Sequence, residues 1–221
     1  MVKMDPENDY IESASGFKLL IDTSYEPEKH IVRTGTVTSL PTHLTWKDGN
    51  PNFPWKTKVE LKIGDQVVMY FLAVQNCLSK ERKNFFKDKN DVWIFIKYHN
   101  IYAAIRDGNI IPINGYVLVE PMEDPAFTSL VARGKKNDIW IPDTREQSKV
   151  DVVFGKVAFT GEKLEKYNSP YKSDEHCNIQ VGDEIVMKRI RDIPVEYEYH
   201  AKLDGGRKLY RMQRHDILAI L

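Results

Sequence analysis

The feature of this sequence that most constrains its fold is an internal repeat. The segment Gly-Asp-Gln-Val-Val-Met at 64–69 recurs as Gly-Asp-Glu-Ile-Val-Met at 182–187. Three further segments recur in the same order in the first and second halves: 16–20 and 115–119, 35–37 and 155–157, and 99–103 and 215–219. Repeated segments in a fixed order indicate two copies of one structural unit.

The spacing of these segments shows where the two copies differ. From the Gly-x-Val segment to the Gly-Asp segment is 29 residues in the first copy (35 to 64) and 27 in the second (155 to 182). From the first repeated segment to Gly-x-Val is 19 residues in the first copy (16 to 35) and 40 in the second (115 to 155). The sequence therefore predicts a duplication in which the second copy has gained 21 residues (40 minus 19) ahead of its Gly-x-Val.

Each copy is predicted to consist of β-strands. Residues 59–63 alternate between apolar and polar side chains, which is the strand period. The runs at 67–74 and 217–221 are apolar or β-branched and are typical of strands covered on both faces. The Gly-Asp dipeptides at 64–65 and 182–183 are turn signals just before a strand. We therefore expect an all-β chain made of two small antiparallel barrels or sandwiches.

Composition narrows the possible partners and location. The 221 residues suffice for two domains, and 32 basic against 32 acidic residues give no electrostatic reason to expect nucleic acid or a membrane as partner. Cys77 and Cys177 form no CxxC pair, so no metal site is expected, and two lone thiols suit a reducing compartment. Residues 1–15 contain no apolar stretch of the kind that a secretory signal needs. A cytoplasmic location is expected.

The second half resembles the GroES-like co-chaperonin family over nearly all of residues 110–221. The resemblance is carried, in order, by Ile111-Pro112-Ile113, the strand 116–120, Ile139-Trp140-Ile141-Pro142-Asp143, Gly155-Lys156-Val157, Val181-Gly182-Asp183 and the terminal segment 214–221. The first half is similar through 62–65 and 101–105, and tandem co-chaperonins of plastids are similar in layout. The resemblance implies two tandem GroES-like antiparallel β-barrels, at 16–107 and 108–221, behind a polar leader at 1–15.

The additional residues fall where this family has its mobile loop, here at about 122–149. The segment is mostly polar and charged, so it cannot bury enough surface to order itself. Its one apolar island is Ile139, Trp140 and Ile141, which Pro142 follows. In the family a hydrophobic tripeptide at this position docks between two helices of the chaperonin's apical domain, and the resemblance implies the same role here.

The triplet also indicates a binding segment on physical grounds, because apolar side chains exposed in a polar loop suit a partner surface. The alternative interpretation is that Ile139–Ile141 forms a strand of the barrel itself. The first copy is expected to lack such a loop and to make no direct chaperonin contact.

The resemblance implies a co-chaperonin without cofactor, which caps an ATP-bound chaperonin ring, assists protein folding and assembles as a homo-oligomeric ring. The alternative function is a structural or assembly protein, for instance of a virus, that keeps the barrel without binding a chaperonin. The sequence contains no GxGxxG and no nucleophile pattern, so no enzyme is expected.

Three other groups of residues were weighed as sites. His99 and His215 recur at equivalent positions but have no second ligand near them, so a structural role is expected. The aromatic residues of 40–57 either line a roof opening or pack one domain on its neighbour. The segment 79–90 mixes lysines with Phe85 and Phe86, as in single-strand binders, but its acids favour a solvated hairpin tip.

Overall fold

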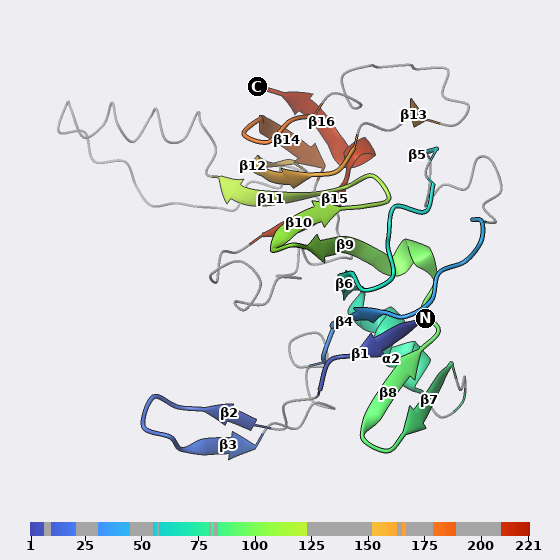
Figure 1. The fold of residues 1–221 in the computed structure, drawn as a ribbon. Coiled ribbons are helices and arrows are strands. Elements are labelled where there is room, and N and C mark those ends of the chain that lie inside the picture. The colour runs from blue at the N-terminus through green and yellow to red at the C-terminus, as the bar shows by residue number, and fades with distance from the viewer. Residues whose placement is uncertain are drawn as a thin grey trace. The chain divides into compact units, whose positions relative to one another are not determined.

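The computed structural model describes residues 1–6, 10–20, 31–44, 55–56, 58–79, 81, 84–122, 152–162, 165–166, 179–188 and 209–221 (Figure 1). These residues are mostly β, and every strand pairing is antiparallel, which confirms the β-rich character predicted from the sequence. The chain divides into two units, one made of residues 1–114 with 164–170 and the other of 115–163 with 171–221. In this part of the chain no helix is long and apolar enough to cross a membrane.

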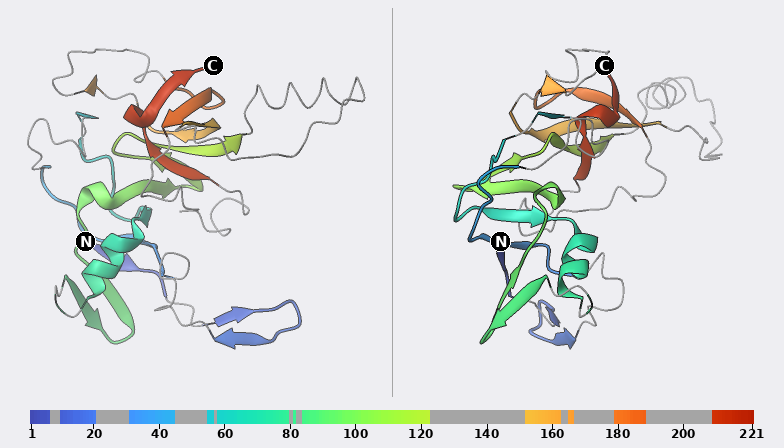
Figure 2. Two further views of the ribbon diagram at one scale, coloured as in Figure 1. Left: turned by 180° about the vertical axis from the view of Figure 1, so that it is seen from behind. Right: turned by 90° about the vertical axis from the view of Figure 1, so that its right-hand side faces the viewer.

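The first unit is built on a seven-stranded sheet in the order β10-β9-β6-β4-β1-β8-β7 (Figure 2). Its strands are β1 (Val2–Met4), β4 (Thr34–Val37), β6 (Gln66–Met69), β7 (Phe85–Asp88), β8 (Asp91–Ile94), β9 (Ile101–Arg106) and β10 (Asn109–Pro112). A 3-10 helix, η1 (Tyr98–Asn100), precedes β9. Two short pairings lie beside this sheet: β2 (Tyr10–Glu12) with β3 (Lys18–Leu20), and β5 (Trp55–Lys56) with β13 (Glu165–Lys166).

Helix α2 (Phe71–Leu78) corrects the prediction of one continuous strand over 67–74. Strand β6 ends at Met69, and α2 follows it almost at once. The helix turns Ala73, Val74 and Cys77 toward the core, at the one- and four-residue spacing of a helix face. A short apolar run fits a buried strand and a buried helix equally well, so this run alone could not separate the two.

The second unit is built on a five-stranded sheet in the order β15-β11-β12-β14-β16. Its strands are β11 (Tyr116–Met122), β12 (Val152–Thr160), β14 (Glu184–Lys188), β15 (Tyr210–Gln213) and β16 (Ile217–Ile220), with the 3-10 helix η3 (Arg214–Asp216) before β16. Among the described residues, no pairing joins the two end strands of either sheet.

The two sheets repeat the same strand pairings. In the first unit β4 pairs with β6 and β6 with β9, as β12 pairs with β14 and β14 with β16 in the second. Gly35 lies opposite Val67, and the equivalent Gly155 lies opposite Ile185. The next ladder carries a register shift at the corresponding step of β6 and β14. The repeat found in the sequence is thus also a repeat of strand pairing and register.

Equivalent residues also build the two cores. The buried pairs are Val2 and Val119, Val37 and Val157, Leu61 and Ile179, Val67 and Ile185, Met69 and Met187, and Ile101 and Ile217. Each such side chain contributes about 1.5–3 kcal/mol when it is fully buried. Each unit therefore has a hydrophobic core of its own, which is what an independently stable domain needs.

The glycine of each Gly-x-Val segment is explained by a close approach of two strands. A Cβ at Gly35 would lie against the carbonyl oxygen of Lys3 and the side chain of Val2. At Gly155 it would lie against the Val119 side chain and 2.8 Å from the carbonyl oxygen of Glu120. Such contacts force the backbone to shift, so only glycine fits at this crossing.

The first strand of the first unit lies at residues 2–4 and not at 16–20, which corrects the predicted layout. Strand β1 pairs with β4 at the same step at which β11 pairs with β12. Val2 is 1% exposed and belongs to the core, so residues 1–15 are not a leader and the first unit does not begin at residue 16. The strand has only three residues, too few to show an alternating pattern.

The segment 16–20, which resembles 115–119 in its letters, has a different place in the fold. Its residues 18–20 form β3, which pairs with β2 and not with the main sheet. The two segments share a glycine, an aromatic residue and two later apolar residues. This composition suits an edge hairpin as well as a core strand, because strand propensity reports little about the neighbouring strand.

Candidate functional site

The predicted binding triplet, Ile139, Trp140 and Ile141, lies outside the described residues, but the strands that flank its segment are described. Strand β11 leads into the segment and β12 follows it. These strands are neighbours in the sheet, and Met122 lies opposite Phe154 at the end of their ladder. Neighbouring strands are about 5 Å apart. The segment that carries the triplet therefore starts and ends side by side on one sheet.

The base of this segment is firmly packed. Val119 and Val157 lie opposite each other in β11 and β12, and both are fully buried. Met187 of β14 lies in the same core, on the other side of β12. A segment held at both ends by a packed sheet is a common way to present binding residues, because the scaffold is rigid and the loop supplies the contacts.

The first unit carries a long segment at the same position, contrary to expectation. Strand β1 ends at Met4 and its neighbour β4 begins at Thr34. Between them the chain forms the β2–β3 hairpin, which Figure 1 shows as two strands joined by one turn. The prediction that the first copy lacks a loop here was wrong because it took residues 16–20 as the first strand. The turn residues at 13–16 between two short apolar segments were the signal that could have located this hairpin.

Hydrogen bonds close the tip of this hairpin. The Ser13 amide donates to the carbonyl oxygen of Phe17 (2.9 Å), and the Phe17 amide donates to the Ser13 hydroxyl (3.1 Å). The Gly16 amide donates to the carbonyl oxygen of Ser13 (2.8 Å), with Gly16 at a φ of +78°. Phe17 stands at the end of this turn with 67% of its surface exposed. The tip is therefore a hydrogen-bonded turn that presents one aromatic side chain.

The second hairpin of the first unit, β7–β8, carries a group of aromatic residues. The rings of Phe86 and Trp93 stack with centroids 4.8 Å apart, and Phe95 lies 6.2 Å from Phe86. Lys3 lies over the Trp93 ring and also pairs with Asp91 at 2.6 Å. The predicted solvated tip at 79–90 is in fact the end of α2 followed by β7. The exposed rings of the hairpin contact each other, and the ammonium of Lys3 is matched by a carboxylate.

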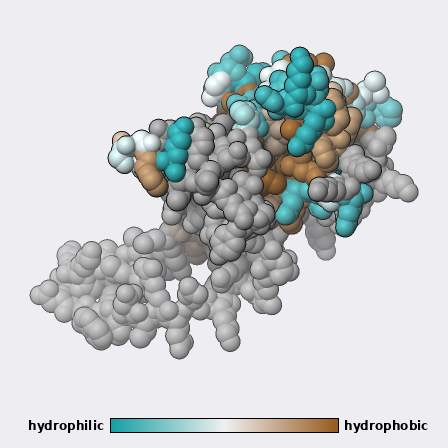
Figure 3. Space-filling view, turned by 90° about the horizontal axis from the view of Figure 1, so that it is seen from below, coloured by the Kyte–Doolittle hydropathy of each residue, from teal (hydrophilic) through white to brown (hydrophobic). Residues whose placement is uncertain are grey.

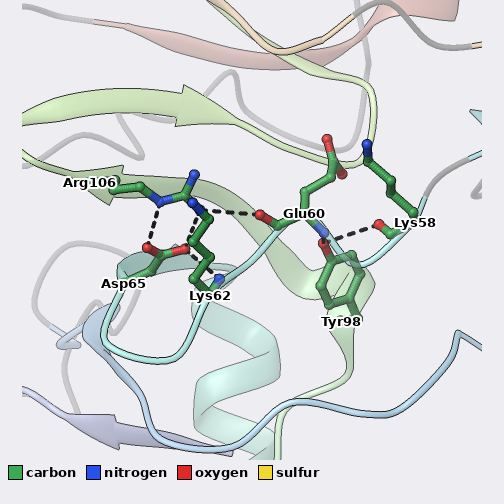
Figure 4. Close-up of polar contacts among 6 residues, drawn as sticks. All are labelled: Lys58, Glu60, Lys62, Asp65, Tyr98 and Arg106. Carbon is green, nitrogen blue, oxygen red and sulfur yellow. Dashed lines mark hydrogen bonds and ion pairs between the residues drawn. The ribbon is translucent and has the colours of Figure 1, made fainter.

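A polar network ties the segment before β6 to β9 and η1 (Figure 4). The Arg106 guanidinium donates to both carboxylate oxygens of Asp65, at 2.9 and 2.7 Å, and the Lys62 amide donates to Asp65 at 2.7 Å. Arg106 also donates to the carbonyl oxygen of Glu60 at 3.2 Å. The Glu60 amide in turn donates to the Tyr98 hydroxyl at 2.6 Å. This network fixes the loop that leads into the Gly-Asp turn.

Neither of the two ionisable groups at the centre of this network suits proton transfer near neutral pH. Burial alone would raise the pKa of Asp65, but the hydrogen bonds from Arg106 and the Lys62 amide outweigh it and hold the pKa below its usual value. Burial raises the pKa of the Tyr98 hydroxyl well above its ordinary value. A general acid or base works best with a pKa near the operating pH. The network is therefore built to hold structure and not to catalyse.

The two repeated histidines lie at matching places, His99 in η1 and His215 in η3. Partial burial, with the nearby Lys97, lowers the pKa of His99. Within the described ranges no group of histidine, cysteine and acidic side chains could hold a metal ion. Of the aromatic residues in 40–57, Trp55 lies in β5, whereas Trp46 and Phe53 lie outside the described residues.

The last strand of the second unit exposes apolar side chains at a sheet edge. Strand β16 is an end strand, and Leu218, Ile220 and Leu221 are 53%, 43% and 61% exposed. Figure 3 shows apolar side chains reaching the surface between polar ones on one face of the protein. Exposed apolar residues along an end strand are a common feature of strands that pair with another chain.

No protein-family model matches this sequence, and no curated protein matches it significantly. The functional interpretation consequently rests on the repeat, the strand register and the chemistry of the exposed segments.

Proposed function

We propose that this protein is a co-chaperonin that caps an ATP-loaded chaperonin ring and assists protein folding. Its two units would be tandem GroES-like barrels, and Ile139, Trp140 and Ile141 would be the residues that contact the chaperonin. The observation that carries the proposal is the position of their segment, which starts and ends on the neighbouring strands β11 and β12. This is the place in the repeat at which the family that the sequence resembles has its mobile loop.

The energetics of such a contact favour several weak sites over one strong site. Burying a tryptophan such as Trp140 removes roughly 200 Å² from water, about 5 kcal/mol as an upper bound. Ordering the loop opposes this gain, because each residue that becomes fixed costs about 1 kcal/mol or more. A single loop would therefore bind weakly, and useful affinity would come from several loops that engage one ring together.

The proposal includes assembly of the chain into a homo-oligomeric ring. Its support is the exposed apolar edge of β16, which would lie at a seam between subunits or domains. In the first unit, β10 covers the equivalent edge of β9. A second chain that supplied a strand to β16 would bury the same surface that β10 buries in the first unit.

The proposed role involves no chemistry in this chain, no cofactor and a cytoplasmic location. The support for a non-catalytic role is the saturated network around Asp65 and the high pKa of Tyr98. In this proposal the energy for the folding cycle comes from the nucleotide that the chaperonin binds.

The test is to measure ATP-dependent capture of the full chain on a purified bacterial-type chaperonin ring, for the wild type and for Trp140→Ala. We expect the variant to lose capture while its melting temperature and oligomeric state stay unchanged. Phe95→Ala is the matched control, because it removes an aromatic side chain that is 55% exposed elsewhere in the chain.

Two outcomes would contradict the proposal. A large fall in the melting temperature of Trp140→Ala would place this residue in a core, where truncation to alanine costs about 3–5 kcal/mol. Capture that persists without Trp140 would remove the triplet from the contact. A wild-type chain that assembles but is never captured would favour the structural or assembly role.

A further inference from the structure

The first unit holds a segment that is equivalent by register to the one proposed to bind the chaperonin. In the first unit Val2 lies opposite Val37, and in the second Val119 lies opposite Val157. The chain leaves β1 and returns to β4, as it leaves β11 and returns to β12. The segment 5–33 is therefore the first unit's counterpart of the segment with the triplet, although the two share no similar sequence.

Within 5–33 one large side chain of the described residues is strongly exposed. Phe17 is 67% exposed, and its neighbours at the tip are serine, alanine, glycine and lysine. The side chain of Phe17 thus stands as a single apolar group among small and polar ones. Aromatic side chains of this kind are enriched among the residues that dominate protein interfaces.

The backbone at the tip is already organised. Two hydrogen bonds join Ser13 and Phe17, and the β2–β3 ladder continues from them, with Glu12 opposite Lys18. A side chain presented by a formed turn loses less conformational freedom on binding than one in a segment that must first become ordered. The hairpin therefore has the geometry of a preformed binding tip.

We infer that Phe17, at the tip of the β2–β3 hairpin, is a second anchor through which the same chain contacts the chaperonin ring. The inference rests on the proposed function, because the partner is identified from the equivalence of the two segments. Each chain then offers two anchors of different kinds, the aliphatic and indole triplet of the second unit and the single phenyl group of the first. Two linked contacts raise the overall affinity beyond that of either alone.

The experiment uses the full chain and a purified bacterial-type chaperonin ring with ATP. Phe17→Ala is compared with Trp140→Ala and with the control Phe95→Ala for apparent affinity. We expect Phe17→Ala to weaken binding by roughly tenfold or more, since one of two linked contacts is lost, while Phe95→Ala leaves it unchanged. Because Phe17 is mostly exposed, its truncation should leave the melting temperature unchanged.

A direct contact measurement accompanies the affinities. A photoreactive phenylalanine analogue in place of Phe17 should cross-link to the chaperonin only when ATP is present. Unchanged affinity together with no cross-link would overturn the inference, and the proposed function would stand if Trp140→Ala still abolishes binding. A cross-link to a second copy of the chain would assign the tip to a subunit contact instead. A wild-type chain that does not bind the ring would overturn both.

Discussion

Strands β9 and β16 are the same strand of the repeat in two different environments. Both begin with a buried isoleucine after a 3-10 helix, and both pair with the preceding strand in the same register. In β9 the next residue, Tyr102, is 1% exposed, whereas its equivalent in β16, Leu218, is 53% exposed. The sequences are similarly apolar, but β10 pairs with β9, and β16 is an end strand. The burial of a strand is thus decided by its neighbour as much as by its own residues.

The Gly-Asp turns give a second comparison between the units. Asp65 and Asp183 accept the same backbone hydrogen bond, from Lys62 at 2.7 Å and from Gln180 at 2.8 Å. Asp65 also binds the side chain of Arg106, which β9 supplies. The turn is common to both copies, and the ion pair is an addition that is described in the first.

The largest expected effect comes from the equivalent core methionines. Met69 and Met187 are both fully buried at matching positions of β6 and β14. Truncating either to alanine should cost about 2–5 kcal/mol of unfolding free energy, because it leaves a cavity. Urea denaturation followed unit by unit should show similar losses for the two variants. A small loss for one of them would mean that the two cores are not equivalent.

A smaller effect is expected at the two turn aspartates. Asp65→Asn should cost about 1–3 kcal/mol, because it also leaves the Arg106 charge without its partner, whereas Asp183→Asn should cost about 1 kcal/mol. The side chains of Asp65 and Arg106 are 4% and 25% exposed, so solvent screens this pair only in part. Equal losses in the two variants would show that the ion pair contributes nothing measurable.

The same aspartate predicts a dependence on pH. The pKa of Asp65 is lower in the folded protein than the value of about 3.9 in an unfolded chain. The stability it contributes is therefore present above about pH 4 and is lost as the pH falls through the folded pKa. Denaturation of the wild type between pH 6 and pH 3 should show this loss, and Asp65→Asn should reduce it. An unchanged acid dependence in the variant would contradict the assignment.

The smallest effect on stability, and a large one on assembly, is expected at the β16 edge. Leu218→Lys should change the unfolding free energy by no more than about 0.5 kcal/mol, because the side chain is exposed. It should nevertheless shift the mass measured by light scattering toward the monomer, since a lysine on an edge strand opposes pairing. An oligomer that survives this change would show that β16 is not the seam.

The features that could be predicted from the sequence are those that depend on local backbone demands. Gly64 and Gly182 sit at φ values of +93° and +98°, which glycine adopts freely, and Gly35 and Gly155 sit where a Cβ would collide with the neighbouring strand. Such demands recur in both copies and so become visible as a repeat.

The features that escaped prediction depend on contacts between distant residues or on ambiguous runs. The three residues of β1 gain their place from pairing with β4 and β8, which no local pattern reports. Helix α2 lies in an apolar run that a strand would satisfy equally well. The β2–β3 hairpin carries a usable turn signal at 13–16, but its similarity to 115–119 concealed it.

The most direct test of the proposed co-chaperonin function is a refolding measurement. A chemically denatured client that needs a capped folding chamber is diluted into a bacterial-type chaperonin ring with ATP, with or without the full chain. The account predicts that the wild-type chain raises the yield of native client and that the Trp140→Ala chain does not. A yield that is the same with and without the wild-type chain would contradict the account.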